Sequence, residues 1–113
     1  MLDKVLVIDD DPNMTDLLML LLKASGFEVI VCSTGLDGVD KAKTESPDVI
    51  LLDLVMEGMD GLQVCTQIRT FSKVPILILS ALDKPGIIVK ALDAGADDFL
   101  TKPVSSGLLI SRL

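Results

Sequence analysis

Short apolar runs alternate with longer amphipathic segments five times along the 113 residues. The runs cover 5–8, 27–32, 49–52, 76–79 and 97–101. The strongest of them are unbroken stretches of Val, Ile and Leu, which is typical of parallel strands buried on both faces. The pattern predicts an α/β fold in which right-handed crossovers place helices on both faces of a parallel sheet.

The segments between the runs carry the local signals of helix ends. Asp11 followed by Pro12 is typical of an N-cap and a first helical position, and Gly26 suits the residue just after that helix. Thr34 is expected to cap a second helix. That helix ends before Pro47, because the residue before a proline avoids helical angles.

The later helices are predicted in the same way. Asp60 and Gln63 have the spacing of a capping box, for a helix that reaches about Phe71. Asp83 is expected to cap a fourth helix, which stops at Gly95. The final residues begin a fifth helix that breaks off, so we expect residues 1–113 to be one domain of a longer chain.

Composition excludes several classes of function. The net charge of −7 argues against direct binding of nucleic acid by this domain. No apolar run approaches the roughly 20 residues of a membrane span, and the N-terminus lacks a signal-peptide layout, so we expect a cytoplasmic protein without membrane contact. Cys32 and Cys65 are expected to be reduced, buried thiols. The absence of His leaves oxygen ligands for any metal site.

Polar side chains follow the strongest runs at the point where each strand ends. Asp9 and Asp10 follow the first strand, Asp53 the third, Ser80 the fourth and Lys102 the fifth. A single Asp after a strand is usually a turn or cap residue. Because parallel strands bring their carboxyl ends to one edge of the sheet, however, this whole set is expected to converge there.

Three converging carboxylates require a counter-charge. At about 4 Å and an effective dielectric constant of about 20, each pair of carboxylates repels by about 4 kcal/mol. A hard divalent ion, Mg²⁺ or Mn²⁺, suits such a group and leaves room for phosphoryl oxygens. Lys102 and Ser80 offer an ammonium and a hydroxyl group to those oxygens, and a nucleophilic Asp would accept the phosphoryl group.

Four motifs of the chain resemble the receiver domain of two-component response regulators. They are VLVIDD at 5–10, LLDLVMEGMDG at 51–61, Ser80-Ala81, and GADDFLTKP at 95–103. The resemblance covers essentially the whole chain. It implies a flavodoxin-like, doubly wound (βα)5 fold of strand order 2-1-3-4-5. It also implies a phosphohistidine donor on a sensor histidine kinase or a phosphotransfer protein.

The resemblance also assigns roles to the residues at the strand ends. Asp53 would be the phosphoacceptor and, with Asp10, a direct Mg²⁺ ligand. Asp9 would bind the ion mainly through water, and the backbone carbonyl of Val55 would complete the protein ligands.

Further residues would contact the phosphoryl group or report its presence. Lys102 and Ser80 would contact it, with Ser80 moving inward, and Phe99 would change rotamer as a switch residue. The bond between Lys102 and Pro103 is expected to be cis, as in the family.

The motif at 95–103 is most similar to receivers attached to winged-helix DNA-binding domains, which regulate transcription. Those receivers dimerise on phosphorylation through the fourth helix, fifth strand and fifth helix, using charged pairs. Asp98 and Arg112 could supply one such pair. Ile88 and Leu108 occupy the positions of another and are apolar, which leaves open an apolar homodimer contact or a different partner.

Three positions depart from the family pattern. Glu57 stands where the family usually has Pro, and it is either a plain exposed loop carboxylate or one that alters Mg²⁺ affinity. Val55 and Leu82 are apolar where polar side chains often influence attack of water on the phosphoryl group. We therefore expect slow autodephosphorylation.

A receiver would catalyse its own phosphotransfer and act as a switch, not as a turnover enzyme. A phosphatase of the haloacid dehalogenase type also uses an aspartyl phosphate, but it needs a second Asp where this chain has Val55. A flavin-binding protein of related topology would have to place phosphate beside Asp9, Asp10 and Asp11, which repel it. A pseudo-receiver that acts as a constitutive interaction module remains the alternative.

Overall fold

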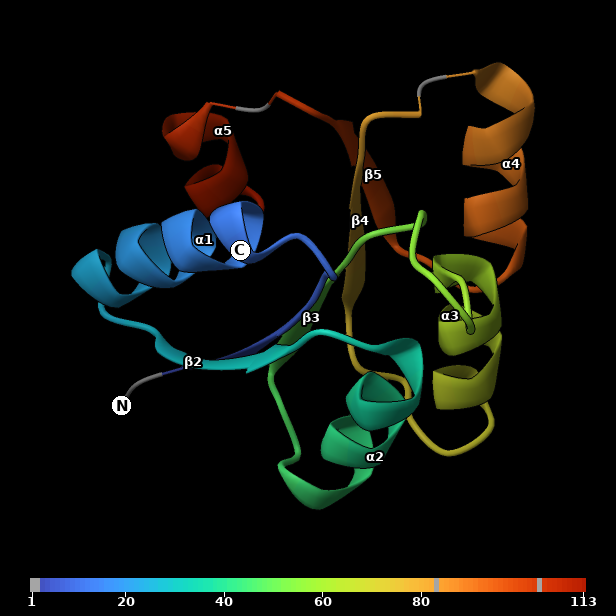
Figure 1. Cartoon of the computed structure of the whole chain (residues 1–113), viewed down its shortest axis with the longest axis horizontal. Helices are drawn as coiled ribbons and strands as arrows, with labels where there is room; N and C mark the ends of the chain where they lie inside the picture. Colours follow the sequence, from blue (N-terminus) through green and yellow to red (C-terminus); the bar gives the residue numbers. More distant parts are fainter. Residues whose placement is uncertain (1–2, 83, 104) are drawn as a thin grey trace.

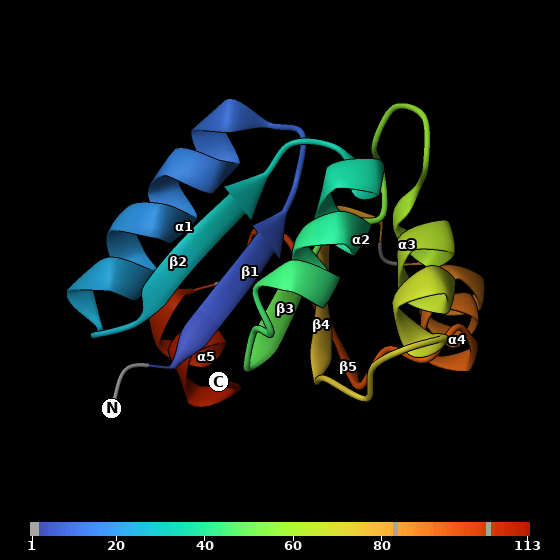
Figure 2. The same ribbon diagram turned by 90° about the horizontal axis from the view of Figure 1, so that it is seen from below.

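The computed structural model describes residues 3–82, 84–103 and 105–113, in which a five-stranded sheet lies between two layers of helices (Figures 1 and 2). The strands are β1 (Lys4–Ile8), β2 (Glu28–Cys32), β3 (Val49–Leu52), β4 (Ile76–Ser80) and β5 (Asp98–Thr101). They pair in parallel in the order β2-β1-β3-β4-β5. The predicted fold class and strand order are therefore confirmed, with strand ends that differ from the apolar runs by one residue at most.

The helices alternate with the strands as predicted. They are α1 (Pro12–Ala24), α2 (Gly35–Thr44), α3 (Gly61–Arg69), α4 (Pro85–Asp93) and α5 (Ser106–Ser111). Asp11 and Thr34 cap α1 and α2 through their side chains, and Asp60 and Gln63 form the predicted capping box of α3.

Two helix ends differ from the prediction. Helix α3 ends at Arg69, with Thr70 as its C-cap, two residues before the predicted Phe71. The N-cap of α4 is Lys84, which makes no side-chain capping hydrogen bond. The predicted cap, Asp83, lies outside the described residues.

Side chains point alternately to the two sides along each strand, so the core has two parts, one on each face of the sheet. On one face, residues such as Leu6, Ile50 and Ile78 pack against α2, α3 and α4. On the other, Val7 and Leu51 pack against α1 and α5. Helices thus cover both faces, because neighbouring residues of a strand point to opposite sides.

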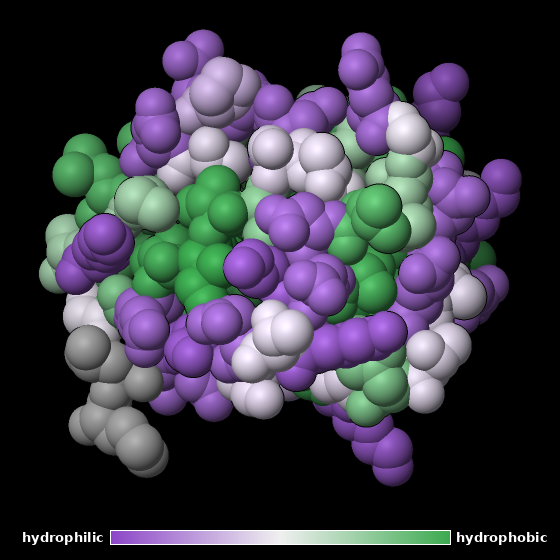
Figure 3. Space-filling model, turned by 60° about the horizontal axis from the view of Figure 1, so that its bottom comes forward, coloured by the Kyte–Doolittle hydropathy of each residue, from purple (hydrophilic) through white to green (hydrophobic). Residues whose placement is uncertain are grey.

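The edges of the sheet are less completely covered. Edge strand β2 leaves Val29, Ile30 and Val31 half-buried, and Figure 3 shows an apolar area on that side of the molecule among hydrophilic side chains. Cys32 and Cys65 are buried free thiols, as predicted. Within the described ranges, no helix is both long and apolar enough to span a membrane.

Candidate functional site

Backbone hydrogen bonds beyond the strand ends bring the predicted site residues together. The N–H of Asp53 donates to the carbonyl of Ile8 at 2.9 Å, which places Asp53 beside Asp9. The N–H of Lys102 donates to the carbonyl of Ser80 at 2.8 Å. The parallel ladder therefore extends past the strands and aligns their polar ends at one edge.

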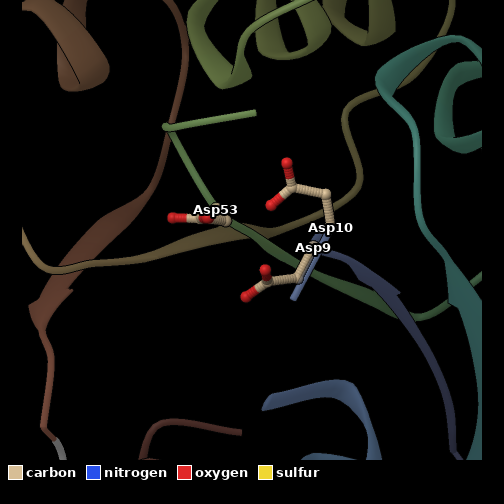
Figure 4. A group of neighbouring side chains, drawn as sticks. All are labelled: Asp9, Asp10 and Asp53. Atoms are coloured by element: carbon tan, nitrogen blue, oxygen red, sulfur yellow. The ribbon is translucent and has the colours of Figure 1, made fainter. Parts of the chain in front are cut away.

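The three carboxylates form one cluster at that edge (Figure 4). One oxygen each from Asp9, Asp10 and Asp53 lies within 4.8 Å of the others. Asp9 and Asp53 are only 3% and 8% exposed, whereas Asp10 is exposed. The cluster is therefore open to solvent on the side of Asp10 and closed by protein behind it.

Lys102 supplies the positive charge inside this cluster. Its Nζ donates to Asp9 Oδ2 at 3.0 Å and lies 3.8 Å from Asp53 Oδ1. Asp9 also accepts the backbone N–H of Asp11 on Oδ1 at 3.0 Å. Buried charges need such partners, and here one ammonium group compensates two carboxylates in part.

The burial and crowding of these charges shift the pKa of Asp53. Burial raises the pKa of its carboxyl group above the ordinary value of 3.8, and the charge of Asp9 raises the pKa further. Lys102 and the backbone N–H groups of Val55 and Leu54 act in the opposite direction. An additional cation at the site would lower the repulsion that raises this pKa.

The donor set fits a hard divalent cation. Its members are carboxylate oxygens, the ligands that Mg²⁺ and Mn²⁺ prefer, and the exposed side of the site can provide water ligands. Asp9, Asp10 and Asp53 are the residues that would hold the ion. Val55 follows Asp53 by two residues, and the role of its carbonyl as a ligand stays a prediction.

Of the two predicted switch residues, Ser80 lies at the end of β4 at this edge, and Phe99 lies opposite Ile78 within the sheet. Ser80 is fully buried, and its Oγ accepts the backbone N–H of Leu82 at 3.2 Å. Phe99 on β5 is half-buried and, like Ile87 of α4, packs against the core on the α2–α4 face. The peptide bond between Lys102 and Pro103 is cis, as expected.

Two of the four residues predicted for a dimer face, Asp98 and Arg112, pair within the chain. Arg112 Nη1 donates to Asp98 Oδ2, so β5 and the end of α5 are joined by an intramolecular ion pair. Ile88 is half-buried and Leu108 is exposed. For Asp98 and Arg112 to pair between two chains, as predicted, this ion pair would have to break within each chain and form again between the chains.

Gly61 positions Asp53 in a way that sequence reasoning missed. A Cβ at residue 61 would lie 2.4 Å from the carbonyl oxygen of Asp53 and 2.6 Å from Leu54 Cα. The N–H of Gly61 also donates to the carbonyl of Leu54 at 3.0 Å. Only the Asp60-Gly61 turn signal was visible in the sequence, and it does not reveal that α3 begins in contact with the Asp53 backbone.

Comparisons with known proteins agree with this geometry. Residues 5–113 match the family model described as response regulator receiver domain. The receiver domain of Francisella response regulator 1452 is 34% identical, with a TM-score of 0.91 over 97% of this chain and 92% of that one. A two-component response regulator from Clostridium difficile is 26% identical, with a TM-score of 0.94 over 97% and 91%.

A third solved structure has the same fold. The BeF3-activated N-terminal receiver domain of RstA from Klebsiella pneumoniae is 29% identical, with a TM-score of 0.93 over 97% of this chain and 94% of that one. The family match spans nearly the whole chain, and the Asp9, Asp53 and Lys102 cluster lies where the receiver motifs predict it. The chain belongs to the response regulator receiver domain family.

Proposed function

We propose that this domain is a phosphorylation-dependent switch of a two-component system, with Asp53 as its phosphoacceptor. The observation that carries the proposal is that the Asp53 carboxylate lies 3.8 Å from the ammonium group of Lys102 and in one cluster with the carboxylates of Asp9 and Asp10. That arrangement offers a nucleophile, a cation for phosphoryl oxygens and ligands for a divalent metal within one small site.

The donor is a phosphohistidine on a sensor histidine kinase or phosphotransfer protein. A carboxylate oxygen of Asp53 forms a bond to phosphorus as the phosphorus–nitrogen bond breaks, and the imidazole leaves and takes up a proton from solvent. A bound Mg²⁺ or Mn²⁺ would neutralise phosphoryl charge. Lys102 would move from Asp9 toward a phosphoryl oxygen, a short movement because its Nζ is already 3.8 Å from Asp53 Oδ1.

The output is a change of the surface formed by α4, β5 and α5. Ser80 would exchange its contact with the Leu82 N–H for one with the phosphoryl group, and the half-buried Phe99 would follow. The reader of this surface is a DNA-binding output domain outside this sequence, a second copy of the domain, or both. The domain itself catalyses only its own phosphorylation and dephosphorylation.

The test uses the purified domain with acetyl phosphate and Mg²⁺, followed by intact mass measurement. The expected result is the gain of one phosphoryl group, which hydroxylamine removes because it cleaves acyl phosphates. The control omits Mg²⁺ and adds a chelator, and labelling should then be lost. Absence of labelling under all conditions would instead support a pseudo-receiver that acts as a constitutive interaction module.

A further inference from the structure

We propose that the backbone N–H of Glu57 orients Asp10 for metal binding, so that Glu57 is a positioning residue of the site. The inference rests on the proposed function, because it concerns the same metal site. It is carried by a contact between the end of β1 and the loop after β3 that the receiver motifs do not imply. The N–H of Glu57 donates to Asp10 Oδ2 at 3.4 Å, although the two residues are 47 positions apart in sequence.

The contact leaves Asp10 free to bind a cation. A carboxylate has two oxygens, so one can accept the amide N–H while the other faces a metal. Asp10 is exposed, and an exposed carboxylate otherwise samples several rotamers. A hydrogen bond that restricts its orientation reduces the entropy lost when it becomes a ligand.

The loop that carries Glu57 is itself anchored at its far end. The capping box of Asp60 and Gln63 fixes the start of α3, and the N–H of Gly61 donates to the carbonyl of Leu54 at 3.0 Å. The bond from Glu57 to Asp10 connects the middle of this loop to the segment that follows β1. It therefore joins the two segments that supply the carboxylates of the site.

This contact depends on a residue with an amide hydrogen at position 57. Proline, the usual family residue by resemblance, has no N–H and cannot donate to Asp10. Glu57 thus affects metal binding through its backbone N–H and not through its carboxylate. Partners that orient metal ligands typically change metal affinity by tenfold or more when they are removed.

A pair of variants separates the two parts of Glu57. Glu57→Ala removes the carboxylate and keeps the N–H, whereas Glu57→Pro removes both. Mn²⁺ affinity is measured by electron paramagnetic resonance of the free ion during titration. We expect Glu57→Ala to bind within about threefold of wild type, because an exposed charge contributes little. Glu57→Pro should bind about tenfold more weakly than Glu57→Ala.

A second readout distinguishes positioning from damage to the loop. The Mg²⁺ concentration for half-maximal phosphorylation by acetyl phosphate should rise in Glu57→Pro, with an unchanged rate at saturating Mg²⁺. Equal Mn²⁺ affinities for the two variants would overturn the proposal, as would a lower saturating rate for Glu57→Pro alone. If wild type itself does not bind Mn²⁺, the metal site of the proposed function fails, and the role of Glu57 fails with it.

Discussion

Lys102 lies closer to Asp9 than to the predicted phosphoacceptor. Its Nζ is 3.0 Å from Asp9 Oδ2 and 3.8 Å from Asp53 Oδ1, and both carboxylates are buried. A divalent ion bound to Asp9 would therefore compete with this ammonium group for the carboxylate. This competition leads to a prediction about stability.

Lys102→Ala should destabilise the metal-free domain. The substitution leaves Asp9 buried without its counter-charge, which costs about 3 kcal/mol of unfolding free energy. Saturating Mg²⁺ should restore much of that loss and stabilise the variant more than it stabilises wild type. The measurement is urea unfolding followed by circular dichroism, since the chain has no Trp or Tyr. An unchanged midpoint in chelator would contradict the prediction.

Asp53 should lower the stability of the metal-free domain as the pH rises. The pKa of Asp53 in the folded state is raised above 3.8, so the folded state binds more protons than the unfolded state in the range above 3.8. The free energy of unfolding therefore falls as the pH rises above 3.8, because Asp53 ionises more readily in the unfolded state than in the folded state. Asp53→Asn removes this loss.

The check on Asp53 compares the two proteins in chelator at several pH values. We expect Asp53→Asn to be more stable than wild type at pH 7, with a smaller difference at pH 4. A difference in stability that does not change with pH would show that ionisation of Asp53 does not destabilise the folded domain.

Gly61→Ala should damage both the fold and the site. The new Cβ would meet the carbonyl oxygen of Asp53 at 2.4 Å, and a backbone atom cannot shift without moving the strand end. We therefore expect the free energy of unfolding to fall by about 2 to 3 kcal/mol and phosphorylation to weaken. Gly86→Ala in α4 is the matched control, because a Cβ there meets nothing within 4 Å. It should stabilise by about 0.5 kcal/mol. Equal effects of the two substitutions, measured by urea unfolding, would rule out the proposed close contact.

The fold and the convergence of Asp9, Asp53 and Lys102 could be predicted because they follow from short-range signals and one topological rule. Apolar runs identify strands, and parallel strands must end at the same edge of the sheet. The contact of Gly61 with Asp53 could not be predicted, because it depends on where α3 begins relative to β3. The amide contact from Glu57 to Asp10 depends equally on the path of a loop.

The contacts of Arg69 could not be predicted from the sequence either. Arg69 donates to the carbonyls of Gly95 and Val74 at 2.9 and 2.7 Å and to Asp97 at 2.9 Å, which joins α3 to the starts of β4 and β5. No motif indicates this connection. The pair between Asp98 and Arg112 was anticipated as a contact between chains, whereas a single chain is able to make it.

The phosphorylated form should be long-lived. Val55 and Leu82 are 57% and 42% exposed, and neither side chain can orient a water molecule for attack on the phosphoryl group. We expect a half-life of minutes or longer, measured by intact mass after removal of acetyl phosphate. Val55→Asn, which adds a polar side chain, should shorten it. A wild-type half-life of seconds would contradict this expectation.

The identity of Asp53 as the phosphoacceptor is tested most directly by intact mass spectrometry of wild type and Asp53→Asn side by side. Both proteins are incubated with acetyl phosphate and Mg²⁺, and circular dichroism verifies that the variant is folded. The account predicts one added phosphoryl group on wild type and none on Asp53→Asn. Labelling of a folded Asp53→Asn to the wild-type extent would contradict it.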